Sequence, residues 1–415
     1  MYVPPATGQL KTLARRALPW LLLVAGICYL YVRLWPSNFI DLGVYRLGGS
    51  ALLHWQPLYD QQYFDAGLPF TYPPFAAFMF IPLALMPFGA AQFVWVVITL
   101  VLLFLVAHLI AGSLPGLAAR KLPWTTTELA AGITGLGLFF EPVWATFSFG
   151  QVNILLMWLV LFDSIRMGRL AGALSGIATG IKIIPGIFVL FMIVTGRWRQ
   201  TFIAAAAFFA TVAVGFIFIP SQAWRYWTTL ALDQGRVGGP EFAGNQSLNG
   251  LLLRVLGPNT SKIVWLASAL AATAVGLWAA RKLWPHTRLL ALSAVGLIGL
   301  LDSPISWNHH WVWMVPLTAC LFGLCARAHA TGSHALSWGA GVIGILMAIV
   351  GVIYPIWWVP NSNHVEFALP FHEQLAANSY ILLGVATLAI IAWAAASAPK
   401  LFANSGPPET NPLIR

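Results

Sequence analysis

The chain has 415 residues, of which 59% are hydrophobic and only 8% are charged, and its mean hydropathy is +0.79. Soluble globular chains carry about a quarter charged residues, so this composition excludes a water-soluble surface and indicates one membrane domain over residues 1–415. The formal net charge of +10 comes from short basic clusters between apolar runs. These Lys and Arg residues form no continuous basic stripe, so the positive charge does not indicate nucleic acid binding.

Apolar runs of the length that crosses a bilayer recur along the chain. The first, Leu18–Trp35, follows basic residues and lacks a cleavage pattern, so we expect a retained anchor with a cytoplasmic N-terminus. The other predicted spans are Ala90–Ala111, Leu129–Phe147, Gln151–Ile165, Thr201–Pro220, Ile263–Ala280, Leu289–Leu301, His310–Ala326, Leu336–Tyr354 and Tyr380–Ala398.

Two further apolar segments contain helix breakers. Leu170–Thr195 is interrupted by Gly180 and Pro185, so we predict two half-helices that meet at the turn Ile181–Pro185. Pro73–Pro87 is short for a full span and is predicted to be a helix embedded at the outer face. With both half-helices, the total is about twelve transmembrane helices, and the tail 399–415 is cytoplasmic.

The basic clusters fix the predicted orientation, because Lys and Arg favour the cytoplasmic side. The opposite, outer side then receives the segments 36–87, 147–151, 221–262, 302–309 and 354–379. These segments hold eight of the twelve acidic residues, namely Asp41, Asp60, Asp65, Asp233, Glu241, Asp302, Glu366 and Glu373. An acidic outer face on a hydrophobic body indicates a reaction at the membrane surface, with 36–87 as the first outer loop.

Asp41 is the leading candidate for chemistry, because it lies just beyond the end of the first span, near the lipid headgroups. A carboxylate there can act as a general base toward a hydroxyl group. The alternative is that Asp41 only N-caps a helix over Leu42–Leu53. The sequence leaves both readings open.

Other polar residues lie at predicted membrane edges or inside apolar runs. Lys182 is a lone cation at depth, where an unpaired charge is costly and a phosphate is its natural partner. His309 and His310 follow Trp307 at the mouth of a span, and a phosphate or proton role is favoured over interfacial packing. Further candidates are Tyr45, Tyr72, Gln151, Asn153, Asn245, Gln246 and Arg254.

Metal binding is not indicated by the sequence. Cys28, Cys320 and Cys325 lie inside apolar runs without ligand spacing, and adjacent His side chains diverge on a helix. No D-x-D element is present. We therefore expect no metal and no other cofactor.

The order of these motifs resembles the polyprenol-phosphate-mannose-dependent mannosyltransferases of actinobacteria, members of the GT-C superfamily. The resemblance runs from about Asp41 to Trp313. It is carried by Asp41 with Tyr45, Thr71-Tyr72-Pro73-Pro74, Gly150-Gln151-Val152-Asn153, Lys182 with Pro185, Asn245-Gln246-Ser247-Leu248 and Ser306-Trp307-Asn308-His309-His310.

The resemblance implies an all-α, polytopic GT-C fold with juxtamembrane helices on the outer face of the plasma membrane. It also implies transfer of mannose from polyprenyl-phosphate-mannose to a glycolipid or mannan acceptor, with inversion to an α linkage, for which α-1,2 is expected. In that reading Asp41 is the base, and Lys182, His309, His310 and Arg254 bind the donor phosphate. The remaining candidates bind sugar or acceptor: Tyr45, Tyr72, Gln151, Asn153, Asn245, Gln246 and Trp307.

Two rival functions remain at this point. Many spans, a broken helix and a buried Lys also occur in transporters or flippases of lipid-linked sugars. A GT-C enzyme that uses another polyprenyl-phosphate sugar, such as arabinofuranose, would keep the same fold and base. The sequence also leaves open the oligomeric state and the choice between phosphatidylinositol mannosides and lipomannan as acceptor.

Overall fold

The computed structural model describes residues 7–35, 37–63, 67–118, 123–233 and 238–403. Asp65 and the tail beyond residue 403 lie outside the described residues, as does the basic pair Arg120-Lys121. The described part is almost wholly helical, in agreement with the predicted fold class. Its one sheet has two short antiparallel strands, β1 (Gln62–Tyr63) and β2 (Leu68–Pro69), with Gln62 opposite Pro69.

Seven helices in the described part are long and apolar enough to cross a membrane, which makes the chain a multi-pass membrane protein. They are α1 (Thr7–Leu34), α5 (Phe88–Ala118), α11 (Trp198–Phe218), α14 (Lys262–Leu283), η4 (Asn308–Trp313) continued by α16 (Met314–Ala330), α17 (His334–Ile353) and α19 (Ser379–Ala396). The predicted total of about twelve spans is not confirmed. Two of the predicted spans, α8 (Asn153–Arg166) and α15 (Arg288–Asp302), have 14 and 15 residues, fewer than the roughly 20 that cross hydrocarbon.

The predicted continuous span Leu129–Phe147 is wrong in one respect, because it is broken. Helices α6 (Thr126–Gly137) and α7 (Glu141–Phe149) meet at an angle of 78°. Phe140 is extended before α7, and Pro142 lies in the first turn of α7, where a proline is well accommodated. The break places the carboxylate of Glu141 at the start of a new helix, inside the protein.

Of the two segments with helix breakers, Leu170–Thr195 folds as predicted, whereas Pro73–Pro87, predicted as a single embedded helix, is divided in two. Helices α9 (Ala173–Ile181) and α10 (Gly186–Val194) flank the expected turn, which carries Lys182. In place of a span, Pro73–Pro87 forms two short helices, α3 (Pro74–Met79) and α4 (Ile81–Ala84).

Helix α2 (Ile40–Leu53) begins earlier than predicted, which changes the reading of Asp41. Its N-cap is Phe39, which is buried, has a left-handed backbone (φ 48°) and makes no side-chain cap. Asp41 lies in the first turn of α2. The alternative that Asp41 N-caps the helix is therefore wrong, since the helix starts before Asp41.

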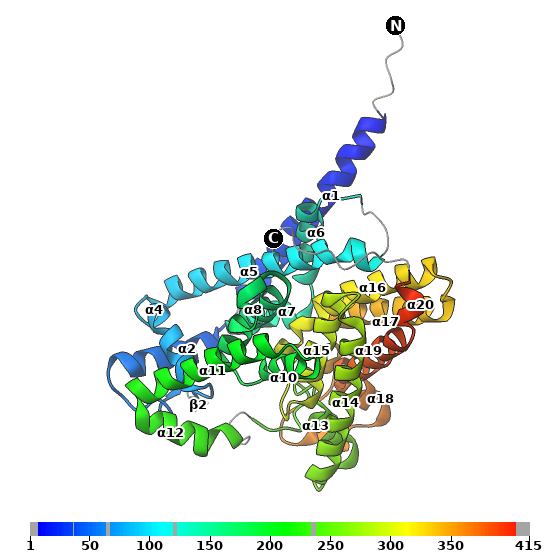
Figure 1. Cartoon of the computed structure of the whole chain (residues 1–415). Coiled ribbons are helices and arrows are strands. Elements are labelled where there is room, and N and C mark those ends of the chain that lie inside the picture. The colour runs from blue at the N-terminus through cyan, green and yellow to red at the C-terminus, as the bar shows by residue number, and fades with distance from the viewer. Residues whose placement is uncertain (1–6, 36, 64–66, 119–122, 234–237, 404–415) are drawn as a thin grey trace.

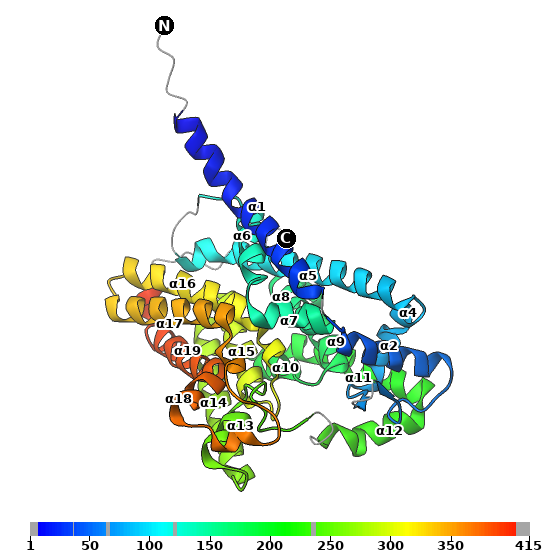
Figure 2. The ribbon, with the colours of Figure 1, turned by 180° about the vertical axis from the view of Figure 1, so that it is seen from behind.

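The remaining elements complete a bundle from which the N-terminal turns of α1 project (Figure 1). They are η1 (Gly168–Leu170), α12 (Pro220–Thr228), η2 (Leu230–Leu232), α13 (Leu248–Leu256), η5 (Pro355–Trp357), η6 (Val365–Ala368), α18 (Phe371–Ala377) and α20 (Ala398–Leu401). Figure 2 shows α16 and α17 side by side from behind, and α1 packs mainly on α6. One large apolar core runs through the bundle and includes Trp311 and Tyr380.

Candidate active site

A buried hydrogen-bonded group links three segments that are far apart in the sequence. The hydroxyl group of Tyr45 on α2 donates to Oε1 of Gln151 (2.8 Å), and the hydroxyl group of Tyr72 donates to the same oxygen (3.2 Å). The two hydroxyl oxygens are 2.9 Å apart. All three side chains are buried, so the end of α7, the start of α3 and the middle of α2 are held together at one point.

Gly150 brings Gln151 next to the start of α2. It ends α7 with φ 72°, and a Cβ atom at this position would lie 2.6 Å from Cβ of Leu42. Glycine is therefore required both by the left-handed backbone and by the close approach. Because Leu42 follows Asp41 directly, the Gly150 turn places the Gln151 amide beside the Asp41 carboxylate.

Asp41 is partly buried in this arrangement. Burial raises the pKa of its carboxyl group to about 6, while the Gln151 amide and the charge of Lys182 act in the opposite direction. A carboxylate with a pKa near neutrality is suited to accept a proton from an alcohol, because general bases work best close to the operating pH.

Lys182 joins the same site from the turn between α9 and α10. Its Nζ atom lies 3.2 Å from Oδ1 of Asn153 and 3.0 Å from Nε2 of His310. It also lies 5.5 Å from the centre of the Tyr72 ring. None of these partners is a carboxylate, and Lys182 forms no ion pair with a described residue, so its ammonium group can still contact an anion.

His309 and His310 are held mainly through the backbone, which leaves ring nitrogens free. The carbonyl oxygen of His309 accepts hydrogen bonds from Thr146 Oγ1 (2.9 Å) and Asn153 Nδ2 (2.8 Å). Within the described residues, neither ring nitrogen of His309 nor Nδ1 of His310 has a hydrogen-bond partner. Buried polar atoms without partners are uncommon, so these nitrogens are candidates to bind a ligand.

A narrow apolar groove of about 50 Å³ opens from this polar group between α8, α10, α15 and η4. Asn153, Lys182 and His310 form its polar end, and residues such as Met157, Phe188 and Trp313 line the rest. A groove with a cationic end and apolar walls fits an amphipathic ligand with an anionic headgroup.

Three other predicted sugar-binding residues lie in loops, engaged with other protein groups. Both amide groups of Asn245 and Gln246 bond to backbone: Asn245 with Pro240, Pro304 and Ser306, and Gln246 with Ala243, Ala377 and Ile381. Both residues are fully buried. Trp307 is partly exposed and pairs with Asn245 in a β-bridge. Asn245 and Gln246 hold loops together here, and their contact with sugar stays a prediction.

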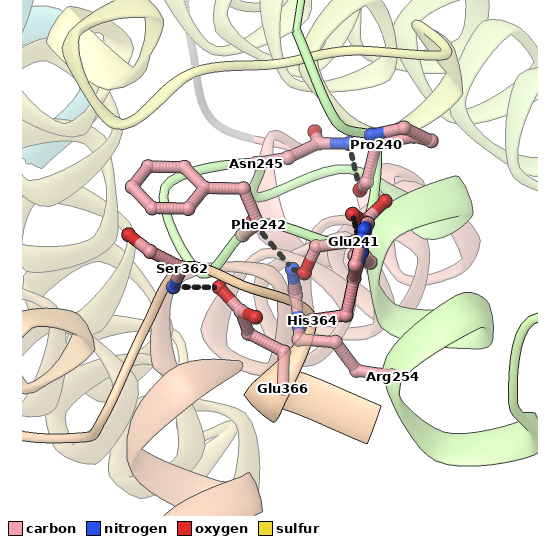
Figure 3. A network of polar contacts seen from close by, with 8 residues as sticks. All are labelled: Pro240, Glu241, Phe242, Asn245, Arg254, Ser362, His364 and Glu366. Atoms are coloured by element: carbon pink, nitrogen blue, oxygen red, sulfur yellow. Dashed lines mark hydrogen bonds and ion pairs between the residues drawn. The ribbon is translucent and has the colours of Figure 1, made fainter. Parts of the chain in front are cut away.

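Arg254 is likewise part of a separate network, shown in Figure 3. Its guanidinium group donates to the carbonyl oxygens of Glu241 (3.1 Å) and Phe242 (3.0 Å) and to Oδ1 of Asn378 (2.9 and 2.7 Å). Burial lowers the pKa of Arg254 to about 9, against the opposing charges of Glu366 and Glu241. None of these contacts involves Lys182 or its neighbours Asn153, His309 and His310, which are called the Lys182 group below. Binding of donor phosphate by Arg254 therefore stays a prediction.

The sequence analysis missed Glu141, which is 1% exposed. Its carboxylate accepts hydrogen bonds from the Tyr380 hydroxyl group (3.0 Å) and the Trp357 indole (3.2 Å), and from the Asn308 amide next to His309. A carboxylate inside an apolar run was the available signal, because such residues are rarely placed there without a function.

No group of three His, Cys, Asp or Glu side chains in the described part of the chain is arranged as metal ligands would be. Two other carboxylates of the predicted outer segments, Asp60 and Asp302, have partners of their own. Asp60 forms an exposed ion pair with Arg225 (2.6 Å), and Asp302 accepts a hydrogen bond from Thr273. Neither contacts the Lys182 group.

Comparison with known proteins agrees with the resemblance found in the sequence. Residues 70–304 match the model of glycosyltransferase family 87. A Mycobacterium tuberculosis protein named "polyprenol-phosphate-mannose-dependent alpha-(1-2)-phosphatidylinositol pentamannoside mannosyltransferase" is 36% identical over 381 residues, covering 90% of this chain and 85% of the relative. A Mycolicibacterium smegmatis protein of the same name is 36% identical over 403 residues, covering 95% and 93%.

A second Mycobacterium tuberculosis protein is named "polyprenol-phosphate-mannose-dependent alpha-(1-2)-phosphatidylinositol mannoside mannosyltransferase". It is 31% identical over 404 residues, which cover 91% of each chain. No solved structure matches the chain. The family model covers more than half of the chain, and the relatives align with nearly all of it. The chain belongs to glycosyltransferase family 87.

Proposed function

We propose that this protein transfers mannose from polyprenyl-phosphate-mannose to a phosphatidylinositol mannoside, forming an α-(1-2) linkage on the extracytoplasmic side of the plasma membrane. The names of its relatives support the donor, the acceptor and the linkage. The single observation that carries the proposal is the placement of Lys182 and His310 at the polar end of an apolar groove, with Asp41 close enough for its charge to interact with that of Lys182.

The arrangement suits a single displacement at the anomeric carbon. Asp41 takes the proton from an acceptor hydroxyl group while that oxygen forms a bond to C1 of mannose. The bond between C1 and the phosphate oxygen breaks at the same time, and the phosphate leaves with its electron pair. One attack from the face opposite the leaving group turns a β-linked donor into an α-linked product.

The departing phosphate needs positive charge and hydrogen-bond donors. Lys182 supplies the charge, and the free ring nitrogens of His309 and His310 supply donors where they carry a hydrogen. Tyr45, Tyr72 and Gln151 form a rigid polar wall next to Asp41 against which a sugar can bind. The apolar groove, of about 50 Å³, then receives only the first part of the polyprenyl chain of the donor.

The rival functions receive no comparable support. The relatives are named as mannosyltransferases, and none of these names refers to a transporter or to an arabinofuranose donor. Between the possible acceptors, the same names favour phosphatidylinositol mannosides over lipomannan chains.

The test is transfer by the purified protein in lipid nanodiscs. Protein supplied with polyprenyl-phosphate-mannose and phosphatidylinositol mannosides should give a product one hexose heavier, and digestion by an α-(1-2)-specific mannosidase should remove that hexose. Transfer from an arabinofuranose donor but not from the mannose donor would overturn the proposal. So would movement of the donor between leaflets without a glycosylated product.

A further inference from the structure

A second hollow lies between α5, α6, α16 and α17. It measures about 490 Å³ and is lined almost wholly by apolar side chains, among them Ile133, Phe140, Phe322 and Ala348. Native interiors contain few voids larger than a water molecule, whereas ligand pockets measure roughly 300–1,000 Å³. A cavity of this size and lining is suited to hydrocarbon.

The cavity reaches the side of the protein that faces lipid. Its lining residues Leu136 and Phe322 are 51% and 44% exposed, and three of the helices that line the cavity, α5, α16 and α17, are long apolar spans. A lipid chain can therefore enter sideways from the bilayer. The cavity shares no lining residue with the groove at Lys182.

A cation without an ion pair lies beyond one end of the cavity. Tyr29 packs on the lining residue Phe139 with tilted rings, 4.9 Å between ring centres. Arg33, one turn further along α1, lies over the rings of Trp144 (3.6 Å), Tyr354 (5.6 Å) and Tyr29 (5.8 Å).

The guanidinium group of Arg33 has capacity left for an anion. Its buried Nε atom has no hydrogen-bond partner, and Arg33 makes no ion pair with any described residue. Glu141 is close enough to interact with it electrostatically, but that carboxylate is taken up by Asn308, Trp357 and Tyr380. A planar guanidinium is well matched to the oxygens of a phosphate.

The Arg33 cluster is joined to the catalytic residues by two segments that run together. Helix α7 carries Trp144 at the cluster and leads to Gln151, which is about 10 Å of helical rise away at about 1.5 Å per residue. The start of α2, which carries Asp41, is tied to the same helix, because the Phe39 amide donates to the Ser148 carbonyl oxygen (3.2 Å). A sugar headgroup can bridge this separation, whereas a bare phospholipid headgroup ends at the cluster.

We propose that this cavity and Arg33 bind the acceptor, with acyl chains in the cavity, the phosphodiester on Arg33 and the glycan extending along α7 to Asp41. The inference rests on the proposed function, since it assigns a binding place to the phosphatidylinositol mannoside. Donor and acceptor chains then occupy separate hollows on the two sides of the reacting atoms.

Cavity filling tests the acyl-chain site. Ala348→Phe should lower kcat/KM for a diacylated acceptor at least tenfold more than kcat/KM for the deacylated, water-soluble headgroup. Ala267→Phe, on an exposed part of α14, is the matched control and should keep the wild-type ratio of the two constants. Equal ratios for Ala348→Phe and wild type would overturn the cavity assignment.

Arg33 is tested by its charge and by its geometry. Arg33→Gln should raise the acceptor KM roughly tenfold, with the donor KM unaffected, and Arg33→Lys should lie in between because it keeps the charge without the planar fork. An Arg33→Gln enzyme with wild-type acceptor KM, or with a raised donor KM alone, would contradict the assignment.

Photolabelling of the wild-type protein makes the test independent of variant folding. An acceptor with a diazirine in an acyl chain should label peptides of α6 and α16, and excess acceptor should suppress the label while phosphatidylglycerol does not. Equal competition by phosphatidylglycerol would show a bulk lipid in the cavity and sink the inference. If the wild type transfers mannose to no phosphatidylinositol mannoside at all, the proposed function itself fails, and these two failures are thereby distinguished.

Discussion

A carboxylate that removes a proton from an alcohol works best when its pKa lies near the working pH, and Asp41 meets this condition through burial. Burial raises the pKa of Asp41 to about 6, and Lys182 and Gln151 keep it from rising further. The same residues that prepare the base also contact Tyr72 and His310 around the expected donor. Base and leaving-group binding are therefore coupled at the level of single side chains.

Asp41→Asn should lower transfer at least about a hundredfold, the usual scale for loss of a general base. It should not lower thermal stability at pH 7. An acid whose pKa is raised on folding costs stability once pH exceeds its unfolded value, and a neutral Asn carries no such cost. Turnover at saturating substrates and a thermal melt check the two parts, and near-normal turnover would remove Asp41 from the mechanism.

The pH profile gives a second test of Asp41. Activity should fall on the acid side as pH drops through about 6, because the base becomes protonated. Lys182→Met should move this midpoint of kcat/KM upward, since the Lys182 charge favours the ionised carboxylate, whereas Lys182→Arg should leave it in place. A downward shift in Lys182→Met would contradict the coupling.

Single side chains also bear on whether transfer depends on a metal ion. We expect full transfer after treatment with EDTA, because Lys182 and the histidines offer positive charge and donors to the phosphate. Dialysis against EDTA followed by rate measurement checks this. Loss of activity that is restored by a divalent cation would show that a metal takes part.

Two buried charged residues, Arg254 and Glu141, connect loops and helix ends to one another. Arg254 ties the loop before α13 to Asn378 at the start of α19, and Glu141 ties the start of α7 to η4. The Glu141 contact holds η4, which carries the two histidines, against α7. The network in Figure 3 holds the loop before α13, and none of its contacts involves Lys182, His309 or His310.

Arg254→Met should destabilise the protein by roughly 3 kcal/mol, since it leaves the Glu241 carbonyl oxygen and the Asn378 amide oxygen without their donor in a buried place. Arg225→Met, which breaks only an exposed ion pair with Asp60, is the control and should change Tm little. Thermal melts in nanodiscs compare the two. Unchanged Tm with a hundredfold slower transfer well below Tm would instead place Arg254 on the phosphate.

The helices and turns were predictable from the sequence where helix-breaking and charged residues lie close together in the chain. Gly180, Lys182 and Pro185 lie within six residues, and the turn between α9 and α10 follows from them. The bend between α6 and α7 was missed because Glu141 and Pro142 were read as part of one apolar run. The reason for that bend lies at long range, in Asn308 and Tyr380, which are 167 and 239 residues from Glu141.

The site was predictable as a set of residue types and not as a set of contacts. Asp41, Lys182 and the histidine pair stood out as polar groups in apolar surroundings. The hydrogen bonds from Tyr45 and Tyr72 to Gln151 were not predictable, because they depend on how α2, α3 and α7 pack together. Sequence spacing also gave no reason to separate Arg254, Asn245 and Gln246 from the Lys182 group.

Orientation is the open property of the whole molecule, and it is testable with single cysteines in a cysteine-free background. Cysteines at Asp60 and His364, both exposed, should react with an impermeant reagent in intact cells, while a cysteine at Arg199, also exposed, should react only after permeabilisation. A cysteine at position 245 is unsuitable for labelling, because Asn245 is fully buried and the reagent could not reach it. Labelling of the Arg199 site from outside would invert the proposed topology.

The two hollows share no lining residue, and this has a kinetic consequence. Two lipids that enter through different portals do not have to displace one another, so the enzyme can form a ternary complex by either order of addition. Spent polyprenyl phosphate can then depart while the elongated glycolipid is still bound. Double-reciprocal plots for the two substrates would intersect, and product inhibition by polyprenyl phosphate would be competitive against the donor alone.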